Sequence, residues 1–257
     1  LKCASAGEDC DIEFDGRAFI VADREACPDG CETISMDEHP VTGVTWHGAL
    51  AFCNWYSAMC GLLPFYDLDE WRPCDYYYSK IGIPEEVMGY RLPFEPEWEY
   101  AAAWEPYPLW KDLFEEHHWI FGFMSDEIDP AYCNYGDNNP LSLSVQPYTT
   151  PVGYYDGSDP TREFAVSPSF CFDMSGNASE WVFGRAQYYP NFDPWGWSEL
   201  AKGNFTTDER VIRGGSYADS EYYQRTAHRA SELPNFTNGK TGFRVARWCW
   251  ECDFGGF

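Results

Sequence analysis

The sequence predicts an α+β fold in which two helices pack on a small, irregular antiparallel sheet with long loops. Two segments, near 45–59 and 91–104, have the composition and spacing of helices. From residue 105 onward, short apolar runs alternate with Gly, Pro, Asn and Asp, and no long helical period recurs. Because 257 residues suffice for one large domain with a substantial core, we expect a single domain over 1–257.

The first predicted helix follows a loop-rich segment, 1–40, and begins after Thr45, whose hydroxyl suits an N-cap. Its apolar residues recur at helical spacing, so one face belongs to the core. Cys53 and Cys60 are seven residues apart and would share a face if the helix continued that far. The apolar stripe consists of Trp46, Ala49, Leu50, Phe52, Cys53 and Trp55.

The second predicted helix has the clearest start in the chain. Pro96 suits a first helical turn, Glu97 and Glu99 suit the positive end of the helix dipole, and the alanines at 101–103 favour propagation. The intervening residues 61–90, rich in Asp, Tyr and Pro, look like an insertion. Later candidate strands are 170–173, 180–182, 210–213 and 242–247.

The net charge of −25 restricts the partners. Nucleic acid and anionic membrane surfaces are both expected to repel such a chain. No apolar run is long enough to cross a bilayer, so we expect no membrane insertion. Solubility, a salty habitat or calcium-binding loops would each explain the acidity. Aromatic residues make up 19% of the chain, enough for both a core and a recognition surface.

Eleven cysteines, mostly in polar, loop-like surroundings, favour disulfides and therefore an extracellular location or a cell or virion surface. Zinc at Cys27/Cys31 and Cys249/Cys252 is the alternative, but no histidine accompanies either pair. The odd count leaves one cysteine for a thiol or an outside partner. The cysteines stand at 3, 10, 27, 31, 53, 60, 74, 133, 171, 249 and 252, and glycosylation sequons begin at Asn177, Asn204 and Asn235.

Five segments, taken in order, resemble the formylglycine-generating enzyme (sulfatase-modifying factor) family. The resemblance runs from about residue 1 to 247 and implies a variant of the C-type lectin fold. It also implies that the family's first strand and helix precede Leu1, where a signal peptide or an assembly contact would lie. The segments are 39–46 (HPVTGVTW) with 49–55 (ALAFCNW), 91–102 (RLPFEPEWEYAA), 172–181 (FDMSGNASEW), 211–217 (VIRGGSY) and 242–247 (GFRVAR).

Two of these motifs also have a simple physical interpretation. The paired glycines Gly214 and Gly215 permit backbone conformations and close packing that a side chain would block. Arg244 is expected to pair with a buried carboxylate, either Glu97 or Glu180. Both are scaffold features in this interpretation.

The family's oxidase chemistry depends on two cysteines that bind copper between the Gly-Gly-Ser and Gly-Phe-Arg segments. Residues 215–242 contain no cysteine, and Asp219 stands about where the first is expected. A carboxylate is a poor substitute for a thiolate at Cu(I), so we expect no copper and no formylglycine generation. The five histidines, at 39, 47, 117, 118 and 228, do not suggest the iron site of the related sulfoxide synthases. A cysteine-independent enzyme stays an alternative.

The same window predicts a binding surface. Variable proteins that resemble this family display a ligand-binding surface there, and its mixture of Tyr, Asn, Asp and Ser is typical of a paratope. The alternative is a solvated loop. A protein or a carbohydrate ligand fits these residues equally, and a structural subunit of a surface assembly is a further alternative. The candidate ligand-binding residues are Asp219, Glu221, Tyr222, Tyr223, Glu232, Asn235, Phe236 and Asn238, with Trp195 and Trp197 from another aromatic segment.

The resemblance also implies a structural calcium ion in the segment 175–180. The implied ligands are the carbonyls of Gly176 and Ala178 and the side chains of Asn177 and Glu180. In the alternative, Asn177 caps a turn and Glu180 pairs with an arginine. A second family site would begin at Asn134, but its downstream carboxylate is missing near 144–146.

Overall fold

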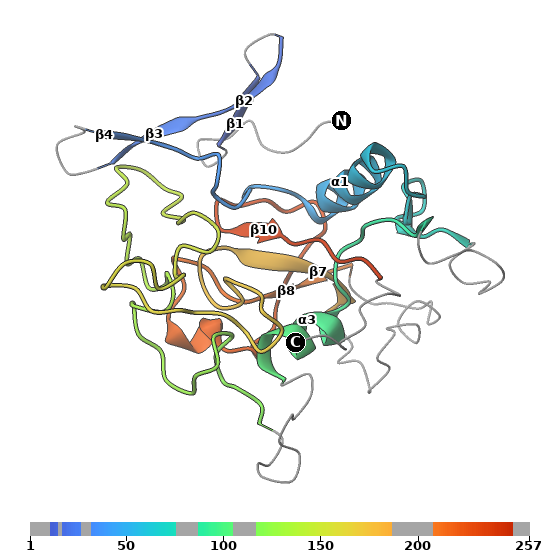
Figure 1. Cartoon of the computed structure of the whole chain (residues 1–257). Coiled ribbons are helices and arrows are strands. Elements are labelled where there is room, and N and C mark those ends of the chain that lie inside the picture. The colour runs from blue at the N-terminus through green and yellow to red at the C-terminus, as the bar shows by residue number, and fades with distance from the viewer. Residues whose placement is uncertain are drawn as a thin grey trace.

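A four-stranded sheet lies between two helices in the computed structural model (Figure 1). The structure describes residues 11–14, 17–26, 32–75, 87–104, 117–186 and 208–248. The strands follow the order β10-β7-β8-β9. The elements are α1 (Trp46–Met59), α3 (Glu95–Ala103), β7 (Ser179–Arg185), β8 (Arg210–Arg213), β9 (Ala230–Glu232) and β10 (Thr241–Phe243). Both predicted helices and the α+β class are therefore confirmed.

The sheet is mixed, whereas the sequence predicted an antiparallel one. β7 pairs antiparallel with β8, and β8 with β9, but β10 runs parallel to β7. Six of the seven residues of β7 are buried. Since successive side chains of a strand point to opposite faces, β7 supplies apolar residues to two separate cores.

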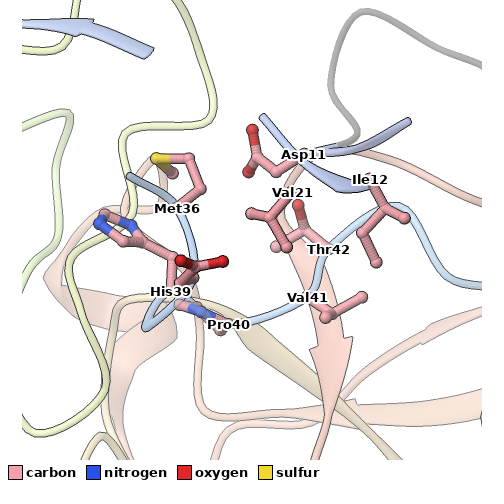
Figure 2. A pocket seen from close by; sticks show the side chains of 9 residues that line it. Asp11, Ile12, Val21, Met36, His39, Pro40, Val41 and Thr42 are labelled. Carbon is pink, nitrogen blue, oxygen red and sulfur yellow. The ribbon is translucent and has the colours of Figure 1, made fainter. Parts of the chain in front are cut away.

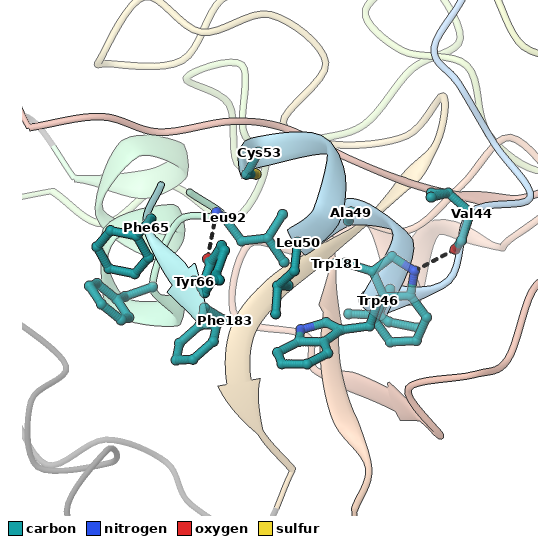
Figure 3. Packing of buried hydrophobic residues seen from close by; sticks show 12 residues of the cluster. Val44, Trp46, Ala49, Leu50, Cys53, Phe65, Tyr66, Leu92, Trp181 and Phe183 are labelled. Carbon is teal, nitrogen blue, oxygen red and sulfur yellow. Dashed lines mark hydrogen bonds between the residues drawn. The ribbon is translucent and has the colours of Figure 1, made fainter. Parts of the chain in front are cut away.

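One core lies under α1 (Figure 3). Thr45 caps this helix, because its side-chain oxygen accepts a hydrogen bond from the Gly48 N–H at 2.9 Å, as predicted. The indole of Trp181 donates to the Val44 carbonyl at 2.9 Å, which fixes the chain entering the helix against β7. The core consists of Val44, Trp46, Ala49, Leu50, Cys53, Phe65, Tyr66, Leu92, Phe94, Trp181, Phe183 and Ile212.

The second core lies on the other face of β7, where Val182 packs with Trp98 and Ala102 of α3. The start of α3 is fixed by Glu97, whose carboxylate accepts from the Phe94 backbone N–H at 2.8 Å and pairs with Arg91 at 2.6 Å. Arg244 pairs instead with Glu180, the other carboxylate that the sequence predicted as its partner.

The segment before residue 40 differs from the loop-rich chain that was predicted. Two antiparallel hairpins form there and extend away from the central sheet (Figure 1). A third short pair of antiparallel strands follows α1 in the sequence. The hairpin strands are β1 (Ile12–Phe14), β2 (Phe19–Val21), β3 (Asp23–Ala26) and β4 (Glu32–Ser35), followed by β5 (Tyr66–Asp67) and β6 (Arg72–Pro73).

One predicted strand, 170–173, is wrong. Phe170 and Asp173 have φ angles of 58° and 57°, which turn the backbone out of the extended region. Phe172 makes an isolated bridge to Val166 instead. Among the described helices, none has the length and apolar character needed to cross a membrane.

Candidate functional site

The candidate site lies on the segment that follows β8, and its position depends on two glycines. Gly214 and Gly215 have φ angles of 92° and 67°, a region that other residues rarely adopt. A Cβ atom on Gly215 would come within 2.5 Å of Gln224 Oε1 and 2.7 Å of the Tyr223 carbonyl. The paired glycines are therefore required for close approach, as predicted, and the approaching element is the 3-10 helix η2 (Glu221–Gln224).

Hydrogen bonds fix the backbone of residues 216–226 at two places. Gln224, fully buried, donates from Nε2 to the carbonyls of Ser216 at 3.0 Å and Asp219 at 2.8 Å. Two residues on, the Thr226 N–H donates to the Ile120 carbonyl at 2.9 Å. The hydroxyl of Thr226 donates to the Trp119 carbonyl at 2.8 Å. The turn is therefore attached both to the glycine segment and to the 119–120 loop.

Four side chains of this turn form a surface cluster, which we call the aromatic patch: Tyr222, Tyr223, Arg225 and His228. The tyrosine rings are 58% and 45% exposed. Their centroids lie 5.5 Å apart at 84°, and the His228 ring lies 5.3 Å from Tyr222 and 4.9 Å from Tyr223. The Arg225 guanidinium carbon lies 3.9 Å above the Tyr222 ring centre. The rings therefore hold one another in place while remaining accessible.

The sequence identified the two tyrosines of the patch but not its other members. Arg225 follows Tyr222 by three residues, and residues three apart lie on the same side of a 3-10 turn. This spacing is the sequence signal that could have placed Arg225 beside Tyr222. His228 joins the patch through a backbone turn, since its N–H donates to the Arg225 carbonyl at 2.8 Å.

Asp219 takes part in the turn itself. Its Oδ2 accepts from the Ser216 N–H at 3.0 Å and from the Ser216 hydroxyl at 2.5 Å, and its Oδ1 lies 3.4 Å from Lys240 Nζ. The carboxylate thus stabilises the loop, which reduces its availability to a ligand. The family's copper site does not fit these residues, because residues 215–242 carry no thiol.

The other predicted ligand-binding residues lie on several different elements. Asn235 and Phe236 lie on an exposed turn after β9, together with Leu233. Glu232 lies on β9 opposite Arg210. The Asn238 side chain accepts from the Lys240 N–H at 2.9 Å and so holds its own turn. Glu221 opens η2 beside the patch, and Trp195 and Trp197 lie outside the described residues.

The predicted calcium ligands have protein partners. Asn177 accepts from the Thr150 N–H at 2.9 Å through Oδ1 and donates to the Thr150 carbonyl at 3.1 Å through Nδ2. Both oxygens of Glu180 accept from Arg244, and Oε2 also accepts from the Trp98 indole at 2.7 Å. The contacts of Glu180 correspond to the alternative in which the glutamate pairs with an arginine, whereas the Asn177 side chain joins two distant segments and caps no turn. These bonds already occupy the side-chain oxygens that a calcium ion would need.

A small hollow lies far along the chain from the patch, between the N-terminal hairpins and the segment before α1 (Figure 2). Its volume is about 60 Å³, well below that of ordinary ligand pockets. His39 lines it, and its Nδ1 lies 2.9 Å from the Thr149 hydroxyl. Burial, with Arg24 nearby, lowers the pKa of His39 to about 4. The hollow is lined by Asp11, Ile12, Val21, Met36, Asp37, His39, Pro40, Val41 and Thr42.

Four cysteines do not form the disulfides that the sequence favoured: Cys53, Cys60, Cys133 and Cys171 are free thiols. Cys53 points into the core under α1, and that helix ends at Met59, so Cys60 lies exposed at its end. The two therefore do not share a face. The cysteines at 3, 10, 27, 31, 249 and 252 lie outside the described residues.

The mixed sheet between two helices, the glycine turn and the long loops define an α+β domain of the C-type-lectin-like type. Residues 21–249 match the sequence model of a protein family, the sulfatase-modifying factor enzyme 1-like domain. The chain belongs to this domain family, which confirms the resemblance found in the sequence.

Its relatives have different names and lengths. Chaperone protein LppX of Paenibacillus barcinonensis is 26% identical over 225 residues, which cover 82% of this chain and 70% of LppX. The formylglycine-generating enzyme of Streptomyces coelicolor is 26% identical over 220 residues, covering 81% of this chain and 52% of the enzyme. Family membership therefore leaves the activity open.

A solved structure supports the fold. Treponema denticola variable protein 1 superposes with a TM-score of 0.52 and 23% identity, over 82% of this chain and 71% of that protein. At this identity the likeness concerns the fold alone.

Proposed function

We propose that this chain is a non-catalytic recognition domain that acts outside the cell or on a cell or virion surface and binds a protein or carbohydrate through the aromatic patch. The observation that carries the proposal is the exposure of Tyr222 and Tyr223 on a backbone held by Gln224 and Thr226. Exposed aromatic rings are common anchors of binding surfaces because they bury a large area at low entropic cost.

Preorganisation supports the same proposal. A ligand need not order this turn, because the hydrogen bonds of Gln224 and Thr226 already do so, and the ring contacts restrict the side chains. Binding to a preformed surface avoids much of the conformational cost of association. Where such a ring is a hot spot of an interface, its truncation to alanine costs about 2 kcal/mol or more of binding free energy.

The non-catalytic part of the proposal rests on the residues available for chemistry. The window between the glycine turn and β10 offers no thiolate for the family's copper chemistry. Its acidic residue nearest the expected cysteine position, Asp219, is hydrogen bonded to Ser216 and faces Lys240. The structural calcium ion that the family resemblance implies at 176–180 is not needed for this proposal, and it is tested separately below.

The test compares ligand capture by three forms of the full chain. The wild-type chain is applied to a panel of defined glycans and purified surface proteins, and each ligand is then measured with Tyr222→Ala/Tyr223→Ala. Trp55→Ala is the matched control, because Trp55 is 49% exposed but lies on α1. We expect the double variant to weaken binding at least about 30-fold and the control to bind as wild type. Ligands that bind all three forms equally would contradict the proposal.

A structural subunit is the second candidate, and one observation favours it. Hairpin β1–β2 is two-stranded and carries Ile12, Ile20 and Val21 with 38–44% of each residue exposed. Exposed apolar hairpins can pair with another chain by strand addition. Light scattering of the purified chain tests this role. Concentration-dependent assembly that is lost in Ile20→Lys would favour it, and a monomer at all concentrations would contradict it.

A further inference from the structure

Arg225 differs from the other arginines near it in having no carboxylate partner. In a chain of net charge −25, a partly exposed arginine such as Arg225 is expected to attract an acidic side chain. Within the described residues, no carboxylate oxygen lies within 4.0 Å of Arg225. Glu221, in the same turn, makes no ion pair with it. Arginines that do pair with carboxylates are Arg24, Arg72, Arg91, Arg162, Arg185, Arg213, Arg229 and Arg244.

The guanidinium of Arg225 is nevertheless held in one place. Its Nε donates to the Tyr222 carbonyl at 3.2 Å, and its central carbon lies over the Tyr222 ring, 3.9 Å from the ring centre. These two contacts use one of its five N–H donors and leave both terminal nitrogens without a hydrogen-bond acceptor among the described residues. A fixed fork with unused donors is the geometry that a carboxylate recognises in a two-point contact.

Charged groups of both signs lie near His228, the fourth member of the patch. Burial lowers the pKa of His228, and Arg213 and Arg225 lower it further, while Asp219 acts in the opposite direction. The two arginines thus disfavour a second positive charge beside them, although the chain as a whole is strongly acidic. The neutral imidazole offers a further hydrogen-bonding group at the edge of the patch.

We propose that the aromatic patch binds a sugar acid, a pyranose that carries one carboxylate. The sugar ring packs on the exposed face of Tyr223, and the carboxylate accepts two hydrogen bonds from the terminal nitrogens of Arg225. This inference rests on the proposed recognition function and names its ligand class. One unpaired guanidinium matches one carboxylate, and the overall charge of −25 disfavours a polyanion.

The shape of the patch favours a sugar over a peptide. Peptides are commonly bound along a strand edge or in an apolar groove. Tyr222 and Tyr223 lie on the 3-10 helix η2, which itself offers no strand edge, and the two rings stand perpendicular to each other. Exposed rings of this kind suit the flat apolar face of a pyranose, with the polar groups of the sugar at the rim.

The experiment titrates the full chain with three small probes: methyl β-glucuronide, methyl β-glucoside and N-acetylglycine. The first has the ring and the carboxylate, the second the ring alone, and the third a carboxylate alone. The aromatic resonances of Tyr222, Tyr223 and His228, assigned with single variants, report binding by NMR. We expect saturable shifts with the glucuronide at a dissociation constant on the order of 1 mM, and at least about tenfold weaker binding of the other two.

The variant Arg225→Gln should weaken glucuronide binding about tenfold and leave the weak glucoside binding unchanged. Arg162→Gln is the matched control, because Arg162 also stacks on a tyrosine, Tyr154, at 4.1 Å, but lies in another loop. Equal binding of glucuronide and glucoside, or an unchanged affinity in Arg225→Gln, would overturn the inference. Preferred binding of N-acetylglycine would indicate a peptide carboxylate and also overturn it, as would the absence of saturable binding by any probe.

These outcomes are distinct from failure of the proposed function. A panel ligand that depends on Tyr222 and Tyr223 keeps the recognition function even where the sugar-acid inference fails. If no ligand of any class depends on these two tyrosines, the recognition function itself is wrong.

Discussion

Arg244 and Glu180 form a two-point ion pair: Nε of the arginine donates to Oε2 at 2.5 Å, and Nη2 donates to Oε1 at 2.6 Å. The arginine follows β10, and the glutamate lies on β7, next to it in the sheet. Trp98 of α3 donates to the same carboxylate at 2.7 Å. The pair therefore connects both strands and α3 at one largely buried point.

Neutralising Glu180 should destabilise the fold. In Glu180→Gln, the Arg244 guanidinium keeps its place but loses its counter-charge in a poorly hydrated site. We expect a loss of about 3 kcal/mol in the free energy of unfolding, measured by urea denaturation. The control is Glu70→Gln, which removes an exposed partner of Arg72 and should leave stability unchanged. Equal losses of unfolding free energy in the two variants would show that the buried ion pair stabilises the fold no more than the exposed one.

The next prediction concerns the effect of calcium on thermal stability. Because Asn177 and Glu180 already bond to Thr150, Arg244 and Trp98, we expect excess calcium or a chelator to change the melting temperature by less than ~1 °C. Differential scanning calorimetry with and without the chelator measures this. A calcium-dependent increase of several degrees that disappears in Glu180→Gln would instead establish the ion that the family resemblance implies.

The sequence predicted the core of the fold because its signals were local. The apolar stripe after Thr45, the helix start near Pro96 and the paired glycines each specify a conformation through neighbouring residues. The hairpins before residue 40 lacked such a signal, since their strands are only three or four residues long. The parallel pairing of β10 with β7 depends on contacts between residues 62 positions apart.

Prediction of the candidate site was partial for the same reason. Tyr222 and Tyr223 stood out by residue type and are exposed. What makes them a rigid surface is the buried amide of Gln224 and the hydroxyl of Thr226, whose partners lie in distant segments. The sequence also treated 217–240 as one surface, whereas Phe236 lies on a turn of its own. No local pattern contains that information.

The free thiols give a prediction about reactivity. Cys60 is exposed and Cys171 partly exposed, whereas Cys53 and Cys133 are buried. Burial raises the pKa of Cys53 to about 12 and also raises that of Cys133, so neither forms the reactive thiolate at neutral pH. Among these four cysteines, alkylation of the native chain, mapped by mass spectrometry, should modify Cys60 and Cys171 first. Cys53 and Cys133 should react only after unfolding.

The thiol experiment also tests the disulfides that the sequence favoured. Cys60→Ser should remove one rapidly modified site without changing the others. If Cys60 or Cys171 resists alkylation until a reductant is added, that cysteine is in a disulfide, and the free thiols of the structure are wrong.

Acid should destabilise the fold through His39. The pKa of this histidine is about 4 in the folded chain, because the ring is buried near Arg24, and about 6.5 in an unfolded chain. Between these values the unfolded chain binds a proton that the folded chain does not. The stability contributed by neutral His39 is therefore complete above pH 6.5 and decreases as the pH falls toward 4. We expect His39 alone to contribute a loss of about 2 kcal/mol between pH 7 and pH 5. Burial raises the pKa of Asp173 to about 6, which offsets part of this loss in the wild type.

Urea denaturation at both pH values measures this loss. In His39→Gln, an uncharged side chain that can still bond to the Thr149 hydroxyl replaces the imidazole, so the difference between pH 7 and pH 5 should shrink by most of that amount. Trp55→Ala is the control, because Trp55 is exposed on α1 and carries no titratable group, so its substitution should leave the difference as in the wild type. An unchanged difference in His39→Gln would mean that His39 titrates alike in both states, and that the contacts around the hollow tolerate a charged ring.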